Sequence, residues 1–532
     1  MPVVRSFRLC TVLVVCVCAT AISRPGQTTI RTVRIERLQV FDTPTGNILE
    51  SAANSLHWTT TEATVRNELL FQEGDSLNPA LIDETERNLR ALPILTGAWI
   101  QVVGDSTDSV DVVVRTRDKW SLGGRVSYRQ GGGLSAIGMS LVEGNMFGKG
   151  QSVGLGYVYQ EEDRASHGMS VELADRRLFS SRWGASLKHA NGRDLTMTSL
   201  ELGRPYYSDA ATWAAGAIFD VSRERLRYYD HAVMMRDTYR SQGRQGAWAS
   251  ISNGEALRLY AGVGYLRARS DADPSFLQTP DNIDMGTVSF GLMRRQYYKS
   301  GYLNSLGVVE DVPAGFHFNV AAGYGRNALR SDRPLVHLGA LWQHSMHVGT
   351  RYYVGYEVSG STFFQGRSST DSRVAAQLVQ HVRLLPQHTL VARLKTMLGS
   401  NWSSSVQPSL GSPNSLRGYP NFTLAGHRIA TGNIEYRFTP DVTLWIFRLG
   451  GAVFHDAAAA WDDGERWTGE HFRHTTGFGL RIENTIRGGN DLLRIDFPFS
   501  HDGKRFTQVV ISGNQLLSAF LDMPILDPLR FN

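Results

Sequence analysis

The stretch "NIEYRF", Asn433–Phe438, alternates strictly between apolar and polar side chains. In a β-strand, successive side chains point to opposite faces, so its three apolar residues share one face while Glu435 and Arg437 share the other. A barrel wall has this character, because lipid covers its outside and its interior is polar. Backbone groups at membrane depth must all be paired, so such a sheet has to close on itself. The stretch therefore predicts a strand of a closed transmembrane β-barrel.

The same period of two continues through most of the chain. "LLRIDFPF", Leu492–Phe499, turns Arg494 and Asp496 inward, and segments such as "GGRVSYRQ" and "QSVGLGYVYQ" follow one another with short turns. These segments predict a membrane all-β fold, a closed antiparallel barrel over residues 121–520, with up to about 20 strands. The charged run 223–242 favours a long surface loop, and the bridge 297–315 fits neither pattern.

Residues 30–120 have a mixed pattern that predicts one small α/β domain before the barrel. Ile30–Phe41 is rich in β-branched residues and predicts a strand. Thr59–Phe71 predicts a helix, and a second helix begins after Asn78, which suits the N-cap, with Pro79 at its first position. "GAWIQVVG" and "SVDVVVRTRD" predict two further strands. The expected element order is β-α-α-β-β.

The first residues predict export rather than fold. Arg5 and Arg8 precede the apolar run "LCTVLVVCVCATA", which ends in small residues, so residues 1–21 are predicted to be a secretory signal peptide. All three cysteines, Cys10, Cys16 and Cys18, lie in this segment, which excludes disulfides and thiol chemistry from the expected mature chain. A formal charge of +5 is no nucleic-acid footprint, whereas 53 glycines and 10% aromatic residues suit an outer-membrane barrel.

Two longer motifs carry a family resemblance. "LFQEGDSLNPALIDETERNLRALPILTGAWIQV" resembles a POTRA domain, the periplasmic module of outer-membrane assembly proteins. "GSPNSLRGY", then "ATGNIEYRF", then "GGAVFHDAAAAWDD" resembles the BamA/TamA outer-membrane assembly superfamily, also called the bacterial surface antigen family. The resemblance implies about 16 barrel strands. It leaves residues 521–532 as a C-terminal tail that such barrels do not usually carry.

The resemblance also implies a site inside the barrel. In that family an Arg-Gly-aromatic loop tip folds into the lumen and meets acidic residues on the wall, which here correspond to Arg417, Gly418 and Tyr419 facing Glu435 and Asp456. The residue types suit these roles, because a guanidinium offers several donors in a planar fork and glycine permits a tight turn. The alternation independently turns Glu435 inward, and Asp456 shares a strand face with Ala452 and Phe454.

Other chemistries find little support in the sequence. The pairs His344 with His347 and His471 with His474 are three residues apart, which on a strand places them on opposite faces, so no metal site is predicted. No nucleophile motif, zinc-protease motif or dinucleotide-binding spacing occurs. The sequence therefore predicts no catalytic residue, no cofactor and no enzyme.

The resemblance implies a cell outer-membrane protein whose POTRA domain stands in the periplasm. Such a protein assembles or translocates others: its POTRA domain receives an unfolded outer-membrane or secreted client, and the seam between its first and last strands opens. Its expected partners are these clients, outer-membrane lipid and periplasmic accessory proteins, with no nucleic acid. A passive channel, or a secretion pore dedicated to one partner, is the alternative.

Overall fold

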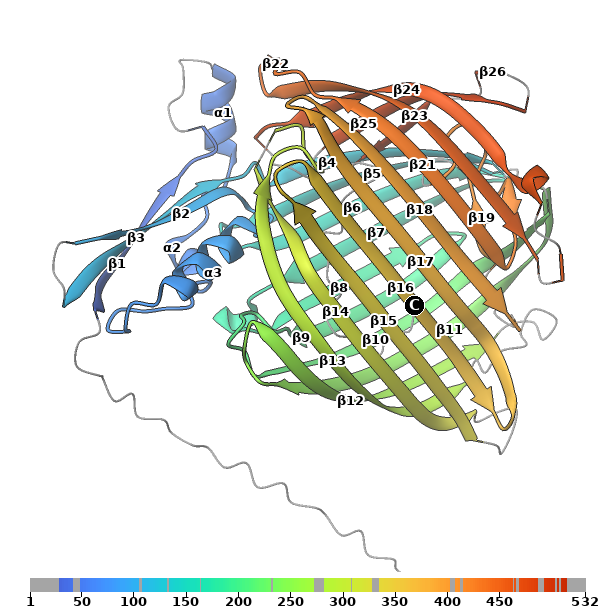
Figure 1. Cartoon of the computed structure of the whole chain (residues 1–532), viewed down its shortest axis with the longest axis horizontal. Helices are drawn as coiled ribbons and strands as arrows, with labels where there is room; N and C mark the ends of the chain where they lie inside the picture. Colours follow the sequence, from blue (N-terminus) through green and yellow to red (C-terminus); the bar gives the residue numbers. More distant parts are fainter. Residues whose placement is uncertain are drawn as a thin grey trace, which may run out of the picture.

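A small three-stranded sheet with helices stands at one end of a large β-barrel (Figure 1). The predicted signal peptide and the predicted C-terminal tail lie outside the residues that the structure describes. This computed structural model describes residues 28–41, 48–104, 108–131, 134–162, 164–230, 233–271, 282–307, 309–327, 334–401, 407–411, 415–462, 464–465, 468–486, 492–502, 505–506 and 509–513. Within these ranges no helix combines the length and apolar character needed to cross a membrane.

The N-terminal unit forms a sheet in the order β1-β3-β2, in which β1 runs parallel to β3 and β3 antiparallel to β2. Its core includes Val65, Leu89, Val112 and Val114, all fully or almost fully buried. Its elements are β1 (Thr29–Leu38), α1 (Ile48–Leu56), α2 (Glu62–Arg66), α3 (Pro79–Arg90), β2 (Leu95–Val103) and β3 (Ser109–Asp118).

The helices of this unit agree with the sequence in part. The side chain of Asn78 caps α3 by accepting a hydrogen bond from the N–H of Ala80 at 3.0 Å, and Pro79 opens that helix as predicted. The helix predicted over residues 59–71 is shorter: α2 has 5 residues, although Leu69 beyond its end is still buried. The short helix α1 was not predicted, so the observed order is β-α-α-α-β-β.

The barrel wall is a single closed ring. Its elements are β4 (Leu122–Gly131), β5 (Leu134–Met146), β6 (Gln151–Glu161), β7 (Ala165–Asp175), β8 (Gly184–Asn191), β9 (Leu195–Arg204), β10 (Trp213–Asp230), β11 (Val233–Ser252), β12 (Leu257–Asp271), β13 (Ile283–Ser300), β14 (Glu310–Asn327), β15 (Pro334–Val348), β16 (Tyr352–Gln365), β17 (Ser368–Leu385), β18 (His388–Ser400), β21 (Arg428–Phe438), β22 (Thr443–Leu444), β23 (Phe447–Trp461), β24 (Arg473–Asn484), β25 (Leu492–Ser500), β26 (Arg505–Phe506) and β27 (Val510–Gly513). Inside this ring lies the short pair β19 (Ser409–Leu410) and β20 (Leu424–Ala425).

The ring contains more strands than the family resemblance implies. Of its 22 elements in the described chain, β22 and β26 are two-residue pieces of turns, which leaves 20 strands in the wall. Consecutive strands of this wall pair antiparallel, from β4 with β5 to β25 with β27, and the ring closes where β27 lies next to β4. This count agrees with the upper figure from the segment pattern and differs from the 16 strands that the resemblance implies.

The alternation that predicted the barrel is confirmed in its wall. On β21, Glu435 and Arg437 are buried, whereas Ile434 is 52% exposed and Tyr436 and Phe438 are also exposed. Elsewhere the outer face carries exposed apolar side chains, among them Leu141, Leu155, Leu200, Val263, Phe290, Val374, Leu394 and Phe478. A continuous apolar exterior around a polar interior is the arrangement of a membrane-spanning barrel.

The structure resolves two segments that the sequence pattern either assigned to a loop or left unassigned. The run 223–242 is not a surface loop, because β10 and β11 pair through it from Trp213↔Ile251 to Asp230↔Val233. Its charged side chains pair with one another, as Arg240 does with Glu224, so the hairpin keeps its ladder despite its polarity. The unassigned bridge 297–315 contains the end of β13, a turn, and the start of β14.

The N-terminal unit is docked on the rim of the barrel (Figure 1). Asn145, near the end of β5, is fully buried and donates from its amide to the carbonyl of Trp58 at 3.1 Å and to the hydroxyl of Thr60 at 3.0 Å. Arg177, in the turn after β7, forms a two-pronged ion pair with Glu68. Since unpaired buried charges and amides are costly, these contacts fix the unit against the rim.

Candidate functional site

The loop between β19 and β20 carries its tip into the barrel interior. Leu416 and Arg417 are fully buried, and Tyr419 is nearly so. Gly418 has a φ of +86°, a left-handed conformation that only glycine adopts without strain, and it turns the chain directly after the arginine. The motif "RGY" therefore builds a tight tip that points one guanidinium at the wall.

The structure brings Arg417 against both acidic residues that the resemblance assigns to it. Its Nε and Nη2 donate to the two carboxylate oxygens of Asp456 at 2.7 and 2.8 Å, and its backbone N–H adds a bond of 3.2 Å to Oδ2. Its Nη1 donates to Oε2 of Glu435 at 2.8 Å. Two strands of the wall, β21 and β23, thus hold one loop residue through a planar fork.

Aromatic and apolar side chains also hold the loop tip against the wall. The guanidinium carbon of Arg417 lies 3.4 Å from the ring centroid of Phe454, whose face attracts a cation. Leu416 and Tyr419 pack in a buried cluster with Ile429 and Ala458, and the Tyr419 hydroxyl donates to the carbonyl of His474 at 3.2 Å, on β24.

The site is larger than the residues that sequence reasoning assigned to it. Asp496 on β25 accepts from Arg417 Nη1 at 3.3 Å and from Arg481 Nη1 at 2.7 Å. Glu435 also accepts from Arg437 Nε at 2.8 Å and from Arg481 Nη2 at 3.1 Å. The alternation of "LLRIDFPF" had already turned Asp496 inward, but it does not say which inward charges lie opposite the loop.

The charges of this cluster nearly compensate one another. The arginines are Arg417, Arg437, Arg481 and Arg494, and the carboxylates are Glu435, Asp456, Asp496 and Glu483, all of them buried. Removing an ion from water costs several kcal/mol unless partners surround it, so each member depends on its neighbours. Each carboxylate that binds Arg417 has a further partner, Asn433 for Asp456 and Arg481 for Glu435 and Asp496, so the arrangement suits a clamp.

The histidine pairs do not come together as metal ligands in the described part of the chain. His344 makes an edge contact with the ring of Tyr356, and the ring of His347 lies 4.1 Å from that of Tyr298. His471 bonds to Thr468 near η2 (Gly469–His471), a one-turn 3-10 helix. No group of three or more metal-binding side chains was found among the described residues.

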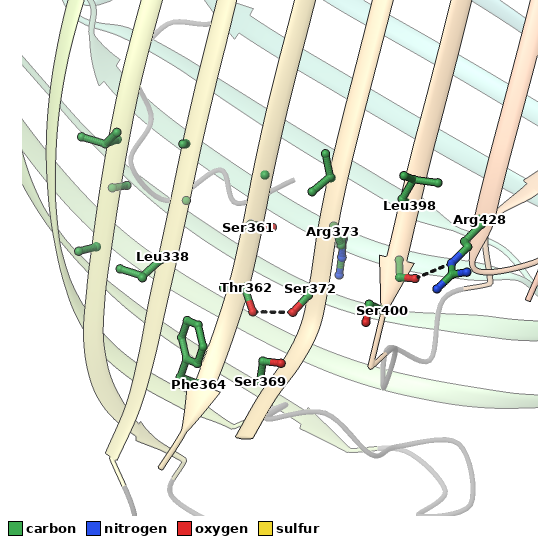
Figure 2. A pocket seen from close by; sticks show the side chains of 18 of the residues that line it. Leu338, Ser361, Thr362, Phe364, Ser369, Ser372, Arg373, Leu398, Ser400 and Arg428 are labelled. Carbon is green, nitrogen blue, oxygen red and sulfur yellow. Dashed lines mark hydrogen bonds between the residues drawn. The ribbon is translucent and has the colours of Figure 1, made fainter. Parts of the chain in front are cut away.

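A hollow of about 1040 Å³ lies on the outer wall, separate from this site (Figure 2). Its lining residues pair directly from strand to strand, and directly paired residues share a face. They include Phe290↔Val320, Ala340↔Gly360, Val374↔Leu398 and Leu398↔Arg428, and Phe290 and Val374 are exposed on the outside. The hollow is therefore part of the apolar outer face of the wall.

Comparisons with known proteins identify no family. No model of a protein family matches the sequence, and no curated protein matches it. Solved structures that match include BamA from Haemophilus ducreyi lacking POTRA domains 1-3, at 14% identity, 92% of this chain, 83% of that chain and a TM-score of 0.38. CdiB from Acinetobacter baumannii matches at 11%, 91%, 73% and 0.41, and CdiB from Escherichia coli at 11%, 91%, 75% and 0.46. At these values the function has to be argued from the geometry of this chain.

Proposed function

We propose that this chain is an outer-membrane protein that assembles other polypeptides into that membrane or moves them across it. In this proposal residues 30–120 form a POTRA-type periplasmic domain that receives an unfolded client, and the barrel of residues 121–520 passes it on through a seam in its wall. Arg417, Gly418 and Tyr419 hold the inner loop, through Glu435 and Asp456, so that the lumen stays occupied. No nucleotide or metal takes part.

An outward N–H on an edge strand supports the client-receiving role. The outer edge of β1 is already used, because Ile30 N–H donates to Asp75 O at 2.9 Å and Gly74 N–H donates to Ile30 O at 2.8 Å. On the outer edge of β2, Ile100 N–H donates to Glu86 of α3 at 3.0 Å. Two residues on, the N–H of Val102 points to the same edge, where an extended client can add as a further strand.

The seam between β27 and β4 is the observation that carries the proposal. The ring closes there, where the described part of β27, Val510–Gly513, lies next to β4 (Leu122–Gly131). These are the last and the first strand of the described wall, so no hairpin turn joins them. Once they separate, each offers its edge as a template for another strand.

Locking the seam tests this proposal. Cysteine pairs along β4 and β27 would be screened for disulfide formation, and purified protein in liposomes would receive a urea-unfolded barrel client. We expect the oxidised lock to reduce client insertion at least tenfold and reduction to restore it. The matched control is Leu292→Cys with Phe318→Cys, a directly opposed pair elsewhere in the wall. Insertion at the normal rate through a fully locked seam would show the proposal to be wrong.

A passive channel, or a secretion pore for one partner, is the alternative function. The buried loop tip counts against a permanently open channel, because Arg417 and its partners fill part of the lumen. The two functions differ in conductance: an open channel gives a large steady current in a planar bilayer, while an occupied assembly barrel gives small, brief openings.

A further inference from the structure

The turn between β13 and β14 is unusual for a turn at the rim of a barrel. Leu303, Asn304, Ser305 and Leu306 are all buried, with Leu306 only 2% exposed. Rim turns usually face water, because their backbone groups need hydrogen-bond partners. Here the partners are internal: Glu310 accepts from the N–H and from the side-chain amide of Asn304 at 2.9 and 3.1 Å. We name residues 301–307 the inner turn.

The inner turn reaches a distant part of the wall. Arg437 on β21 donates to the carbonyl of Leu303 at 2.8 Å, and the N–H of Leu306 donates to Glu483 on β24 at 3.0 Å. Arg448 on β23 donates to the carbonyl of Leu306 at 3.0 Å. Along the shorter way round the ring, β15, β16, β17, β18, β21 and β23 lie between β14 and β24, so these bonds must cross the interior.

The near side of the inner turn is held by packing and by the N-terminal unit. Leu303 packs in a buried cluster with Val312 and Tyr353 on the adjacent wall. Beside Val312, Asp311 accepts from Arg90 at the end of α3, with Nε at 2.7 Å and Nη2 at 3.0 Å. Arg87 of the same helix lies over the ring of Tyr297 at 4.6 Å. The base of the hairpin is thus bound to α3 through a partly buried, two-pronged ion pair.

A continuous chain of polar groups joins the inner turn to the tip of the loop between β19 and β20. Arg437, which holds the inner turn, donates at 2.8 Å to Glu435, which in turn accepts from Arg417 of the loop between β19 and β20. Glu435 and Arg437 are two residues apart on one strand, so both point inward. The two inward folds, one from each end of the barrel, are therefore anchored on neighbouring residues of β21.

We propose that the inner turn is a gate that closes the lumen from the end that carries the N-terminal unit, and that Arg90 of α3 is its latch. When the N-terminal unit tilts away from the rim, the bond from Arg90 to Asp311 breaks and the base of the hairpin is released. The turn then leaves its bonds with Arg437 and Glu483, and the lumen opens to ions and small solutes. This gating does not require that the protein assemble others.

Conductance of the full chain in a planar bilayer tests the gate. Ser300 and Glu310 are directly paired, so a two-residue Asn-Gly turn can join them in place of residues 301–309. We expect this replacement to raise the time-averaged conductance at least tenfold. We expect Arg90→Ala to raise it by roughly tenfold, the shift that follows from losing a charge-assisted pair. Arg66→Ala, which removes an exposed i,i+4 pair with Glu62, is the control and should leave the conductance unchanged.

Thiol labelling gives a second, independent measurement. With Cys10, Cys16 and Cys18 replaced by serine, Leu306→Cys carries the one thiol of the chain. It should resist a membrane-impermeant maleimide and should react at least tenfold faster when combined with Arg90→Ala. Wild-type conductance after replacement of the turn, or equal labelling with and without Arg90→Ala, would overturn the gate. Neither measurement uses a client polypeptide, so both still test the gate if the seam test contradicts the proposed function.

Discussion

Arg417 shows how a single residue can hold a loop inside a barrel. Its guanidinium and backbone N–H meet Asp456, Glu435 and Asp496 within 3.3 Å, and its side chain is fully buried. An ion in such a place is stable only while its partners remain, because an unpaired buried charge is strongly destabilising. The loop is therefore tied to the wall by a bond that cannot be weakened without cost to the barrel.

Replacing Arg417 tests this tie. Arg417→Ala leaves three buried carboxylates short of a partner, so we expect the free energy of unfolding to fall by about 3–5 kcal/mol. Arg417→Lys keeps the charge but loses the planar fork and should lie between the alanine variant and the wild type. The temperature at which the barrel no longer migrates on a gel as a compact, folded species measures the stability of both variants. Equal temperatures for all three proteins would contradict the tie.

The two carboxylates of the clamp should differ in their effects. Asp456 serves the loop, with three bonds to Arg417, whereas Glu435 also accepts from Arg437 and Arg481. Asp456→Asn should mainly raise the rate at which protease cuts the loop. Glu435→Gln weakens three arginine contacts, so it should lower the unfolding temperature more. If both variants change the two measurements in the same proportion, the division of roles is wrong.

Individual residues could be predicted from the sequence only where the pattern sets their direction. The alternation in "NIEYRF" turned Glu435 inward, and "LLRIDFPF" did the same for Asp496. That Arg417 faces Glu435 and Asp456 came from a family resemblance, because spacing along a loop does not say where its tip lies. The bond from Arg481 to Asp496 was not predicted, because it depends on the register of β24 against β25.

At the scale of the element, β24 can approach Asp496 of the clamp closely because Gly479 has no side chain. A Cβ added at Gly479 would lie 2.1 Å from Oδ1 of Asp496 and 2.9 Å from the carbonyl oxygen of Ile495. Gly479→Ala should therefore destabilise the barrel by about 1–3 kcal/mol, the usual cost of overpacking. Gly286→Ala on β13 is the matched control, since a Cβ there meets nothing within 4 Å. Urea unfolding of both variants measures the difference, and equal midpoints would contradict this account.

The outer edge of β2 gives a second prediction at this scale. Proline at Val102 removes an outward N–H and leaves the ladder to β3 intact, so Val102→Pro should weaken client binding at least tenfold while the unit stays folded. Gln101→Pro removes an N–H that points toward β3 and should unfold the unit instead. Crosslinking of an unfolded client to β2, with circular dichroism of both variants, measures the two effects. Unchanged crosslinking in Val102→Pro would exclude this edge as the client site.

Helices and strands were predicted well where amphipathic periodicity determines their structure, and poorly where tertiary contacts determine it. Strand β1 and helix α3 follow from β-branched runs and a cap. The run 223–242 of the β10–β11 hairpin favours a loop in sequence because its charges hide the period of two, although those charges pair across its strands. The inner turn could not be predicted, since its partners on β21 and β24 are more than a hundred residues away.

At the scale of the whole molecule, one closed wall separates an apolar exterior from a buried network of charges. The class of fold follows from sequence alone, because the period of two predicts strands and a sheet must close to pair every backbone group in a membrane. The number of strands does not, because charged hairpins and short strands blur the segments. The N-terminal unit, the inner turn and the loop between β19 and β20 are linked in series. Arg90 binds Asp311 at the base of the inner turn, Arg437 binds Leu303 within it, and Glu435 joins Arg437 to Arg417.

The central claim is that this barrel acts on other proteins, and an inventory of the outer membrane tests it most directly. The chain would be depleted in its host, and outer-membrane and secreted proteins would be quantified, with the wild-type gene supplied in trans as the control. The account predicts that a defined set of these proteins falls at least severalfold and recovers with the wild-type gene. An unchanged inventory, together with altered uptake of small solutes, would contradict it and indicate a channel.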